Sequence, residues 1–132
     1  MNTQNNRDRY LQDAVATASP ARLLTMLYDR LTRDLTGAEL AIMDGEFAQA
    51  SNHLVHAQEI VLELRSSLNV AVWKGGAGLS ELYGYLYAEL VHANVKKDHH
   101  RVAECRRLVE PLRDAWHEAA LLAAMPVTVG VS

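Results

Sequence analysis

The chain has 132 residues, of which 49% are hydrophobic and 22% are charged, so its composition is that of a folded domain and excludes a disordered or collagen-like protein. Its 13 Lys and Arg residues against 16 Asp and Glu residues give a net charge of -3, so no basic excess points to nucleic-acid binding. No apolar run is long enough to cross a bilayer, and the polar start of the chain lacks the apolar core of a secretory signal. The single cysteine, Cys105, excludes a disulfide framework and predicts a reduced, cytoplasmic protein. We expect one domain over residues 1–132, with loose ends at about 1–8 and 125–132.

Turn and cap signals divide the chain into helices. Ser19 followed by Pro20 is a strong start signal, because a hydroxyl side chain suits the N-cap and proline suits the first helical position. Asp98 is placed to cap a later helix in the same way. The predicted elements are a short helix at 9–17, long helices at 20–43, 46–68, 79–95 and 99–124, and a glycine-rich loop at 70–78.

Apolar residues recur every three or four positions in each long segment, which places one apolar stripe on one face of each helix. The four stripes begin at Leu24, Phe47, Leu79 and Val102 and end at Ile42, Leu68, Ala93 and Ala119. Alternation with period two is essentially absent, so strands are not expected. Short connections favour antiparallel neighbours. The predicted fold is therefore all-α, an antiparallel up-down four-helix bundle with a short extra N-terminal helix.

Pro111 interrupts the last predicted helix. Proline lacks a backbone donor and crowds the carbonyl of the residue four positions earlier, so we expect a bend between Arg107 and Pro111.

Several apolar residues fall off these stripes and are candidates for a binding surface. Together they predict an exterior too apolar for a solitary bundle and suited to an incoming amphipathic helix or apolar peptide. These residues are Met26, Leu40, Met43, Val55, Leu62, Tyr87, Val91 and Val95.

A metal-dependent enzyme is a competing hypothesis, because helical bundles host di-iron sites built from Glu-x-x-His motifs. The chain contains Glu89-x-x-His92 and the weaker Asp114-x-x-His117. Neither motif projects from the centre of its apolar stripe, so their ligands do not converge in the core. We therefore expect no catalytic residues, no metal and no cofactor.

A surface metal is a weaker alternative at His53 and His56, with Glu59 and Glu63 further along the same helix. A solvated polar face is the favoured interpretation of these four residues. A generic dimerising adaptor remains a further alternative, with the chain as a monomer or a weak homodimer.

Four motifs occur in order along the chain, and together they resemble the FliS family of flagellar secretion chaperones over about residues 8–118. Tyr10 occupies the place of the family's N-terminal tyrosine. The loop that contains Trp73, and Pro111, depart from the family pattern. The motifs are Ser19-Pro20-x-Arg22-Leu23-Leu24-x-Met26-Leu27-Tyr28-Asp29, Ala57-Gln58-Glu59-Ile60-Val61-Leu62-Glu63-Leu64, Leu82-Tyr83-x-Tyr85 with Leu90-x-x-Ala93-Asn94, and Leu112-Arg113-x-Ala115-Trp116.

This resemblance implies a cytoplasmic, non-enzymatic chaperone. Its partner would be the disordered C-terminal segment of flagellin, which it would keep from polymerising and help to deliver to the type III export apparatus. The export gate and flagellar regulators are further candidate partners. Asn94 joins the eight apolar residues as a candidate for binding the partner's backbone, with a role at the helix C-cap as the alternative. The resemblance also implies that Tyr10, Leu11 and Val15 form an N-terminal lid over the apolar surface, with a fixed capping helix as the alternative.

Overall fold

The computed structural model describes residues 20–68 and 75–125. Within these ranges the chain forms the helices α2 (Pro20–Met43), α3 (Phe47–Ser67), α4 (Gly76–Lys96) and α5 (His99–Ala124), and no strand. The predicted short helix at 9–17, the loop residues 69–74 and the tail from residue 126 lie outside the described residues. The all-α fold is confirmed.

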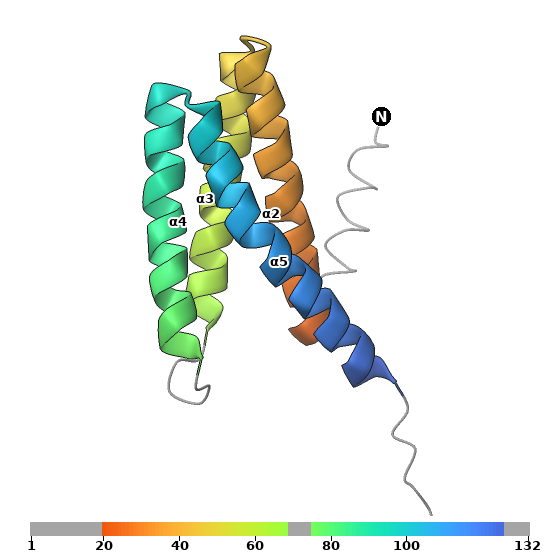
Figure 1. The fold of residues 1–132 in the computed structure, drawn as a ribbon. Helices are drawn as coiled ribbons and strands as arrows, with labels where there is room; N and C mark the ends of the chain where they lie inside the picture. Colours follow the sequence, from red (N-terminus) through yellow and green to blue (C-terminus); the bar gives the residue numbers. More distant parts are fainter. Residues whose placement is uncertain (1–19, 69–74, 126–132) are drawn as a thin grey trace, which may run out of the picture.

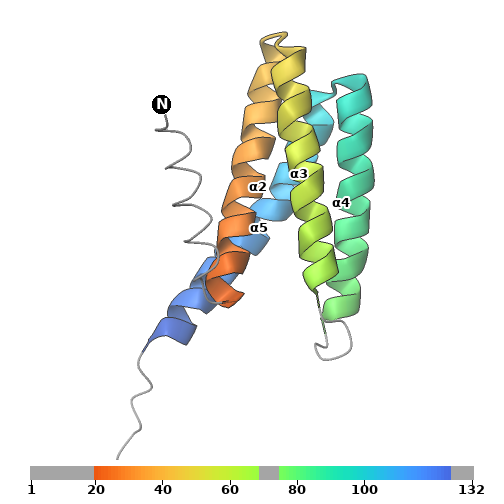
Figure 2. The same cartoon turned by 180° about the vertical axis from the view of Figure 1, so that it is seen from behind.

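The four helices run up and down and form a closed ring of neighbours (Figure 1). α2 packs on α3, α3 on α4, α4 on α5 and α5 back on α2. From behind, α3 lies between α2 and α4 (Figure 2). The contact between α4 and α5 is the least extensive of the four. The antiparallel up-down bundle predicted from the sequence is therefore the observed arrangement.

Caps and turns set the helix ends close to the predicted positions. α2 and α5 have the predicted bounds. Gly45 in the α2–α3 turn has a φ of 75°, a conformation that glycine adopts at little cost. The Asp98 carboxylate accepts hydrogen bonds from the backbone N–H groups of His100 and Arg101, which confirms its capping role.

The start of α4 differs from the prediction, because the helix begins at Gly76 rather than at residue 79. The glycines at positions 76 and 78 were interpreted as loop residues, yet they form the first turn of the helix. The N–H of Leu79 donates to the carbonyl of Gly75, and Gly76 is buried. The low helix propensity of glycine is thus overridden by tertiary packing at this end of the bundle.

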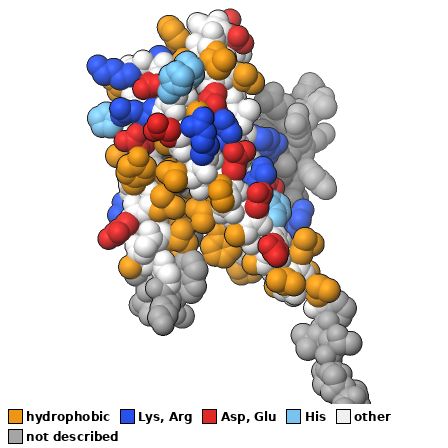
Figure 3. Space-filling model, in the orientation of Figure 1, with side chains coloured by type: hydrophobic (Ala, Val, Ile, Leu, Met, Phe, Trp, Pro, Cys, Tyr) orange, Lys and Arg blue, Asp and Glu red, His pale blue; other side chains and the backbone are white. Residues whose placement is uncertain are grey.

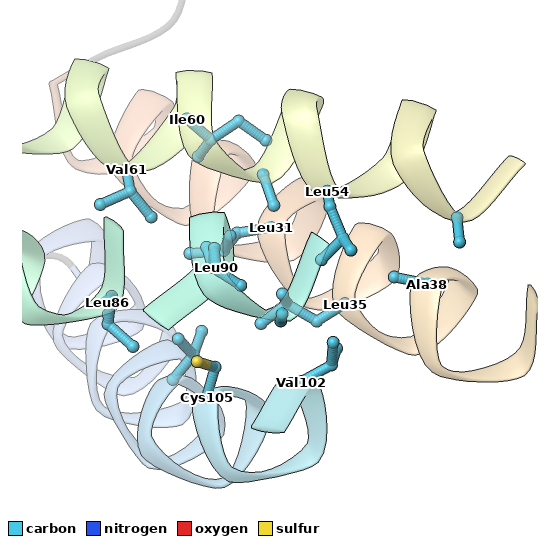
Figure 4. Packing of buried hydrophobic residues seen from close by; sticks show 14 of the residues in the cluster. Leu31, Leu35, Ala38, Leu54, Ile60, Val61, Leu86, Leu90, Val102 and Cys105 are labelled. Atoms are coloured by element: carbon cyan, nitrogen blue, oxygen red, sulfur yellow. The ribbon is translucent and has the colours of Figure 1, made fainter. Parts of the chain in front are cut away.

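Aliphatic side chains from all four helices meet in one core (Figure 4). Cys105 is buried in it, as expected for a small hydrophobic residue, and burial raises the pKa of its thiol to about 12. Two residues that the periodicity places in the buried stripes are exposed instead. Phe47 is 52% exposed because it lies at the tip of the bundle as the first residue of α3, and Ala119 is exposed on the last part of α5. The central core residues include Leu31, Leu35, Leu54, Val61, Leu86, Leu90 and Val102.

Beyond its middle, α5 separates from α4. The helix is continuous through Pro111, but its fully buried residues all precede that proline, the last of them being Val109. Figure 1 shows the second half of α5 slanting away from α4 while it stays beside the start of α2. The separation of the two helices leaves apolar surface uncovered at this end of the bundle.

Candidate binding surface

An apolar pocket of about 270 Å³ lies at the end of the bundle where α5 separates from α4; we call it the end pocket. It forms between the start of α2, the end of α3 and the start of α4, and Trp116 provides its wall from α5. Because α5 slants away here, only this one large side chain reaches across. The lining residues are Pro20, Leu23, Leu24, Leu27, Glu63, Leu64, Ser67, Leu68, Leu79, Tyr83 and Trp116.

Two tyrosines from neighbouring helices form the polar floor beside this pocket. The hydroxyls of Tyr28 on α2 and Tyr83 on α4 lie 2.6 Å apart in a buried hydrogen bond. Burial raises the pKa of both phenols, and hydrogen bonding from Tyr83 and Trp116 lessens the effect at Tyr28. The Trp116 ring is tilted at 46° to that of Tyr28, with centroids 6.5 Å apart. Both phenols are therefore uncharged near neutral pH.

An apolar strip lies between α4 and α5 next to the end pocket; we call it the α4–α5 face and define it by Leu82, Tyr85, Leu108 and Leu112. Its position follows from the bridge between Arg101 and Glu89, whose atoms lie 3.5 Å apart. Leu108 and Leu112, seven and eleven positions after Arg101, lie on the same side of α5 as that arginine. Tyr85 and Leu82, four and seven positions before Glu89, lie on the same side of α4 as that glutamate.

The exposure of the α4–α5 face makes it available to a partner. Tyr85 and Leu108 are exposed, and Leu82 and Leu112 are half-buried against the core. Figure 3 shows apolar side chains gathered over the lower part of this side of the molecule, with charged side chains concentrated above them. Leu82 and Leu112 each lie one helical turn from a lining residue of the end pocket, Leu79 and Trp116, so the face and the pocket adjoin and form one apolar region.

A second and wider hollow, of about 780 Å³, lies between the start of α2 and the end of α5; we call it the α2–α5 groove. Met26, one of the residues predicted to bind a partner, lines it. So does Leu121, which is 70% exposed. The other lining residues are Pro20, Ala21, Arg22, Thr25, Asp29, His117, Ala120, Ala123 and Ala124.

Five of the predicted binding residues lie along the line where α3 meets α4; we call them the α3–α4 seam: Val55, Leu62, Tyr87, Val91 and Val95. Bonded pairs mark this line. Asn94 Nδ2 donates to Ser51 Oγ at 3.3 Å, and the Arg65 guanidinium lies against Gly84 and donates to Ser80. Each seam residue lies within about one helical turn of a residue named in these contacts. Val55 follows Ser51 and Leu62 precedes Arg65 on α3, while Tyr87 follows Gly84, and Val91 and Val95 flank Asn94 on α4. Val95 is the most exposed of them at 74%.

The Asn94 side chain is engaged within the chain itself. Besides its bond to Ser51, its Oδ1 accepts from Lys97 Nζ at 2.6 Å, and its backbone carbonyl accepts from the same amine at 2.7 Å. Lys97 has a φ of 49° and ends α4 in the left-handed conformation. Asn94 therefore contributes to the helix end.

Leu40 and Met43 lie near the α2–α3 turn, apart from the end pocket and the α2–α5 groove. Both are exposed, and they line a small hollow of about 180 Å³ beside Arg106. The nine predicted binding residues are thus divided among the α3–α4 seam, the α2–α5 groove and this small hollow.

His53 and His56, predicted to lie on a solvated polar face, are partly exposed and also pair with a buried carboxylate. Asp34 on α2 accepts from His53 Nδ1 at 3.1 Å and from His56 Nδ1 at 2.8 Å. Arg30 Nη2 lies 3.3 Å from His56 Nε2, so that nitrogen is an acceptor and His56 carries its proton on Nδ1. Gly37 makes room for the His53 ring, because a Cβ there would lie 2.7 Å from it.

Two of the other candidate metal ligands also have partners within the chain. Glu89 pairs with Arg101, and His117 Nε2 lies 2.6 Å from Asp29 Oδ1. Among residues 20–68 and 75–125, no group of three or more His, Cys, Asp or Glu side chains is arranged to hold a metal ion. None of the helices in these ranges is both long and apolar enough to span a membrane.

Sequence reasoning missed most of the α4–α5 face and the exposed apolar end of α5. The periodicity places Leu112 in the core stripe, and it does not distinguish Leu108, Leu121 or Leu122 as exposed apolar residues. The signal was present, because Leu108, Leu112, Ala115, Ala119 and Leu122 follow one another at alternating intervals of four and three.

Comparisons with known proteins agree on one family. The sequence model of the family described as "Flagellar protein FliS" matches residues 2–123. The chain is 35% identical over 119 residues to the "Flagellar secretion chaperone FliS" of Bacillus subtilis, covering 90% of this chain and 89% of that protein. It is 31% identical to the protein of the same name from Salmonella typhimurium, covering 82% of each.

The fold also matches a solved structure. A crystal structure described as a flagellar chaperone from bacteria superposes with a TM-score of 0.70 at 19% sequence identity, covering 89% of this chain and 96% of that one. At this identity the match concerns the fold alone.

Proposed function

Because the chain belongs to the FliS family of flagellar secretion chaperones, we propose that it binds the disordered C-terminal segment of flagellin in the cytoplasm. Binding keeps the segment from polymerising prematurely and aids its delivery to the type III export apparatus. The role is that of a non-enzymatic binding protein, without cofactor or metal. The export gate and flagellar regulators are proposed as further partners.

The observation that carries this proposal is the uncovered apolar region formed by the end pocket and the α4–α5 face. A flagellin segment that folds into an amphipathic helix needs a complementary apolar surface, because the burial of its own apolar face must offset the entropy lost on ordering. The separation of α5 from α4 leaves such a surface, with Trp116 at the wall of a pocket that accepts one large apolar side chain.

The α3–α4 seam and the hollow at Leu40 and Met43 are proposed as additional contacts for the same partner. They are shallow and lie away from the end pocket, so an extended segment that reaches them would wrap around the bundle. Affinity spread over several shallow contacts allows release at the export apparatus, since no single deep anchor must be broken. Asn94 supports the seam by fixing the end of α4.

The N-terminal segment is proposed to act as a lid when flagellin is absent. The segment joins α2 at Pro20, which lines both the end pocket and the α2–α5 groove. Tyr10, Leu11 and Val15 are the apolar residues that would cover this surface. Removal of residues 1–17 should then raise affinity for flagellin and lower the solubility of the free protein. A fixed capping helix would leave the affinity unchanged.

Titration calorimetry with a peptide of the flagellin C-terminus from the same cell tests the proposed function. We expect binding with a large negative heat-capacity change, which marks apolar burial. Replacement of Leu108 by Glu places a charge on the α4–α5 face and should weaken binding at least tenfold. The matched control is Ala48→Glu, at an exposed position at the start of α3. Equal affinities of the two variants would rule out this face as the binding site.

A dimerising adaptor would behave differently in the same samples. Sedimentation at increasing concentration would then show association of the free protein, and calorimetry would show no heat with the flagellin peptide.

A further inference from the structure

The first half of α5 is fixed to the bundle on two sides. Its buried residues, from Val102 to Val109, belong to the core. Arg101 forms an ion pair with Glu89 on α4, and Arg106 forms a bidentate ion pair with Glu39 on α2. Residues 99–110 therefore cannot move without opening the core.

Pro111 follows directly after this fixed half. Because proline has no N–H, the carbonyl of Arg107 has no donor four residues later. Its ring also crowds that carbonyl, so the helix is weakest between residues 107 and 111. Pro111 is exposed, so its ring is not held by packing against the bundle.

The second half, which we call the α5 arm (residues 112–124), is joined to α2 by a row of contacts and packs on the core through two partly buried side chains, Leu112 and Trp116. Trp116 packs on Tyr28, and the next residue, His117, bonds to the next residue of α2, Asp29, at 2.6 Å. The end pocket lies on one side of this row and the α2–α5 groove on the other. No residue of the arm is fully buried.

We propose that the α5 arm is a hinged element that pivots at residues 107–111 and is latched in the closed position by the His117–Asp29 pair. When the arm swings out, Trp116 leaves the wall of the end pocket, and the pocket and the groove become one continuous cleft. The device goes beyond the proposed function and does not depend on the identity of the partner.

Hydrogen exchange of the free protein, read by mass spectrometry on α5 peptides, tests the hinge. Amides of residues 112–124 should exchange roughly ten times faster than those of residues 99–110, because the arm opens without unfolding the core. Pro111→Ala restores the missing donor and should slow exchange of the arm several-fold. The control is Glu104→Ala, an exposed substitution in the fixed half and outside the pivot. Uniform exchange along α5, or no effect of Pro111→Ala, would overturn the hinge.

The latch is tested by Asp29→Asn and His117→Gln. Each should speed exchange of the arm about two- to fivefold, the range expected for loss of a partly exposed polar side-chain pair, and leave residues 99–110 unchanged. Asp114→Asn is the control, since Asp114 is exposed and accepts hydrogen bonds from its neighbour Arg113 within the arm. In a Trp73→Phe background, acrylamide should quench Trp116 more strongly in both latch variants. Equal acceleration over the whole bundle, or unchanged quenching, would contradict the latch.

Discussion

The hydroxyls of Tyr28 and Tyr83 join α2 to α4 across the bundle through a buried hydrogen bond of 2.6 Å. The two helices are diagonal neighbours in the ring, so this bond ties together elements that share little other contact. It lies directly beside the end pocket, where α5 no longer covers the core. The pair therefore provides a polar cross-link at the least covered end of the molecule.

We expect a thermodynamic coupling between the two tyrosines. Tyr83→Phe leaves the Tyr28 hydroxyl without its closest partner and should lower the free energy of unfolding by about 1–2 kcal/mol. The double variant Tyr28→Phe, Tyr83→Phe should lose less than the sum of the single variants, because no buried hydroxyl is left unpaired. Urea unfolding of the four proteins measures the coupling. Strictly additive losses would show that the bond contributes nothing.

The same pair should make the protein sensitive to alkali. The pKa of both tyrosines is raised in the folded state, so the unfolded chain binds fewer protons than the folded chain above pH 10, and stability falls as the pH rises. The loss should approach about 1.4 kcal/mol per pH unit for each tyrosine. Cys105 adds to the fall from about pH 9, since burial raises the pKa of its thiol.

Urea midpoints between pH 8 and 11 isolate the contribution of the tyrosines. The double phenylalanine variant retains Cys105 and should lose stability less steeply than the wild-type protein. Parallel pH profiles for the two proteins would contradict the assignment.

Gly37→Ala tests the packing of His53 against α2. Alanine in a helix interior gains about 0.5–1 kcal/mol over glycine, but here its Cβ would lie 2.7 Å from the His53 ring and displace it from Asp34. In a His53→Ala background the substitution should therefore stabilise the protein by the full propensity gain. In the wild-type background it should be near neutral. Equal gains in the two backgrounds, measured by urea unfolding, would show that the ring moves at no cost.

Local signals were sufficient for most of the fold. The N-terminal proline of α2, the Asp98 cap and the three-four spacing of leucines predicted the bounds of α2 and α5 and the bundle itself. Gly76 differs from the prediction, because glycine marks a turn in isolation, whereas here it is buried in the first turn of α4. Phe47 follows the periodicity of α3, but as the first residue of that helix it lies at the tip of the bundle and is exposed.

The candidate binding surface was predicted only in part. The helical wheel identified Val55 and Val91 as lying off their stripes, which depends on local spacing alone. It placed Leu112 in the core because it assumes that a neighbour covers the stripe along its whole length. The separation of α5 from α4 decides that coverage, and it depends on how two whole helices pack. The pairing of His53 and His56 with Asp34 was likewise invisible, since the carboxylate lies on another helix.

The lone thiol gives the molecule a built-in reporter of opening. Cys105 is 1% exposed in the fixed half of α5, and its raised pKa keeps it protonated and unreactive while the bundle is closed. A thiol reagent such as dithionitrobenzoate can therefore label the chain only when the core between α4 and α5 breaks apart. Labelling rates measured with and without a client peptide would give the frequency of that event directly, with no dye or tag added to the protein.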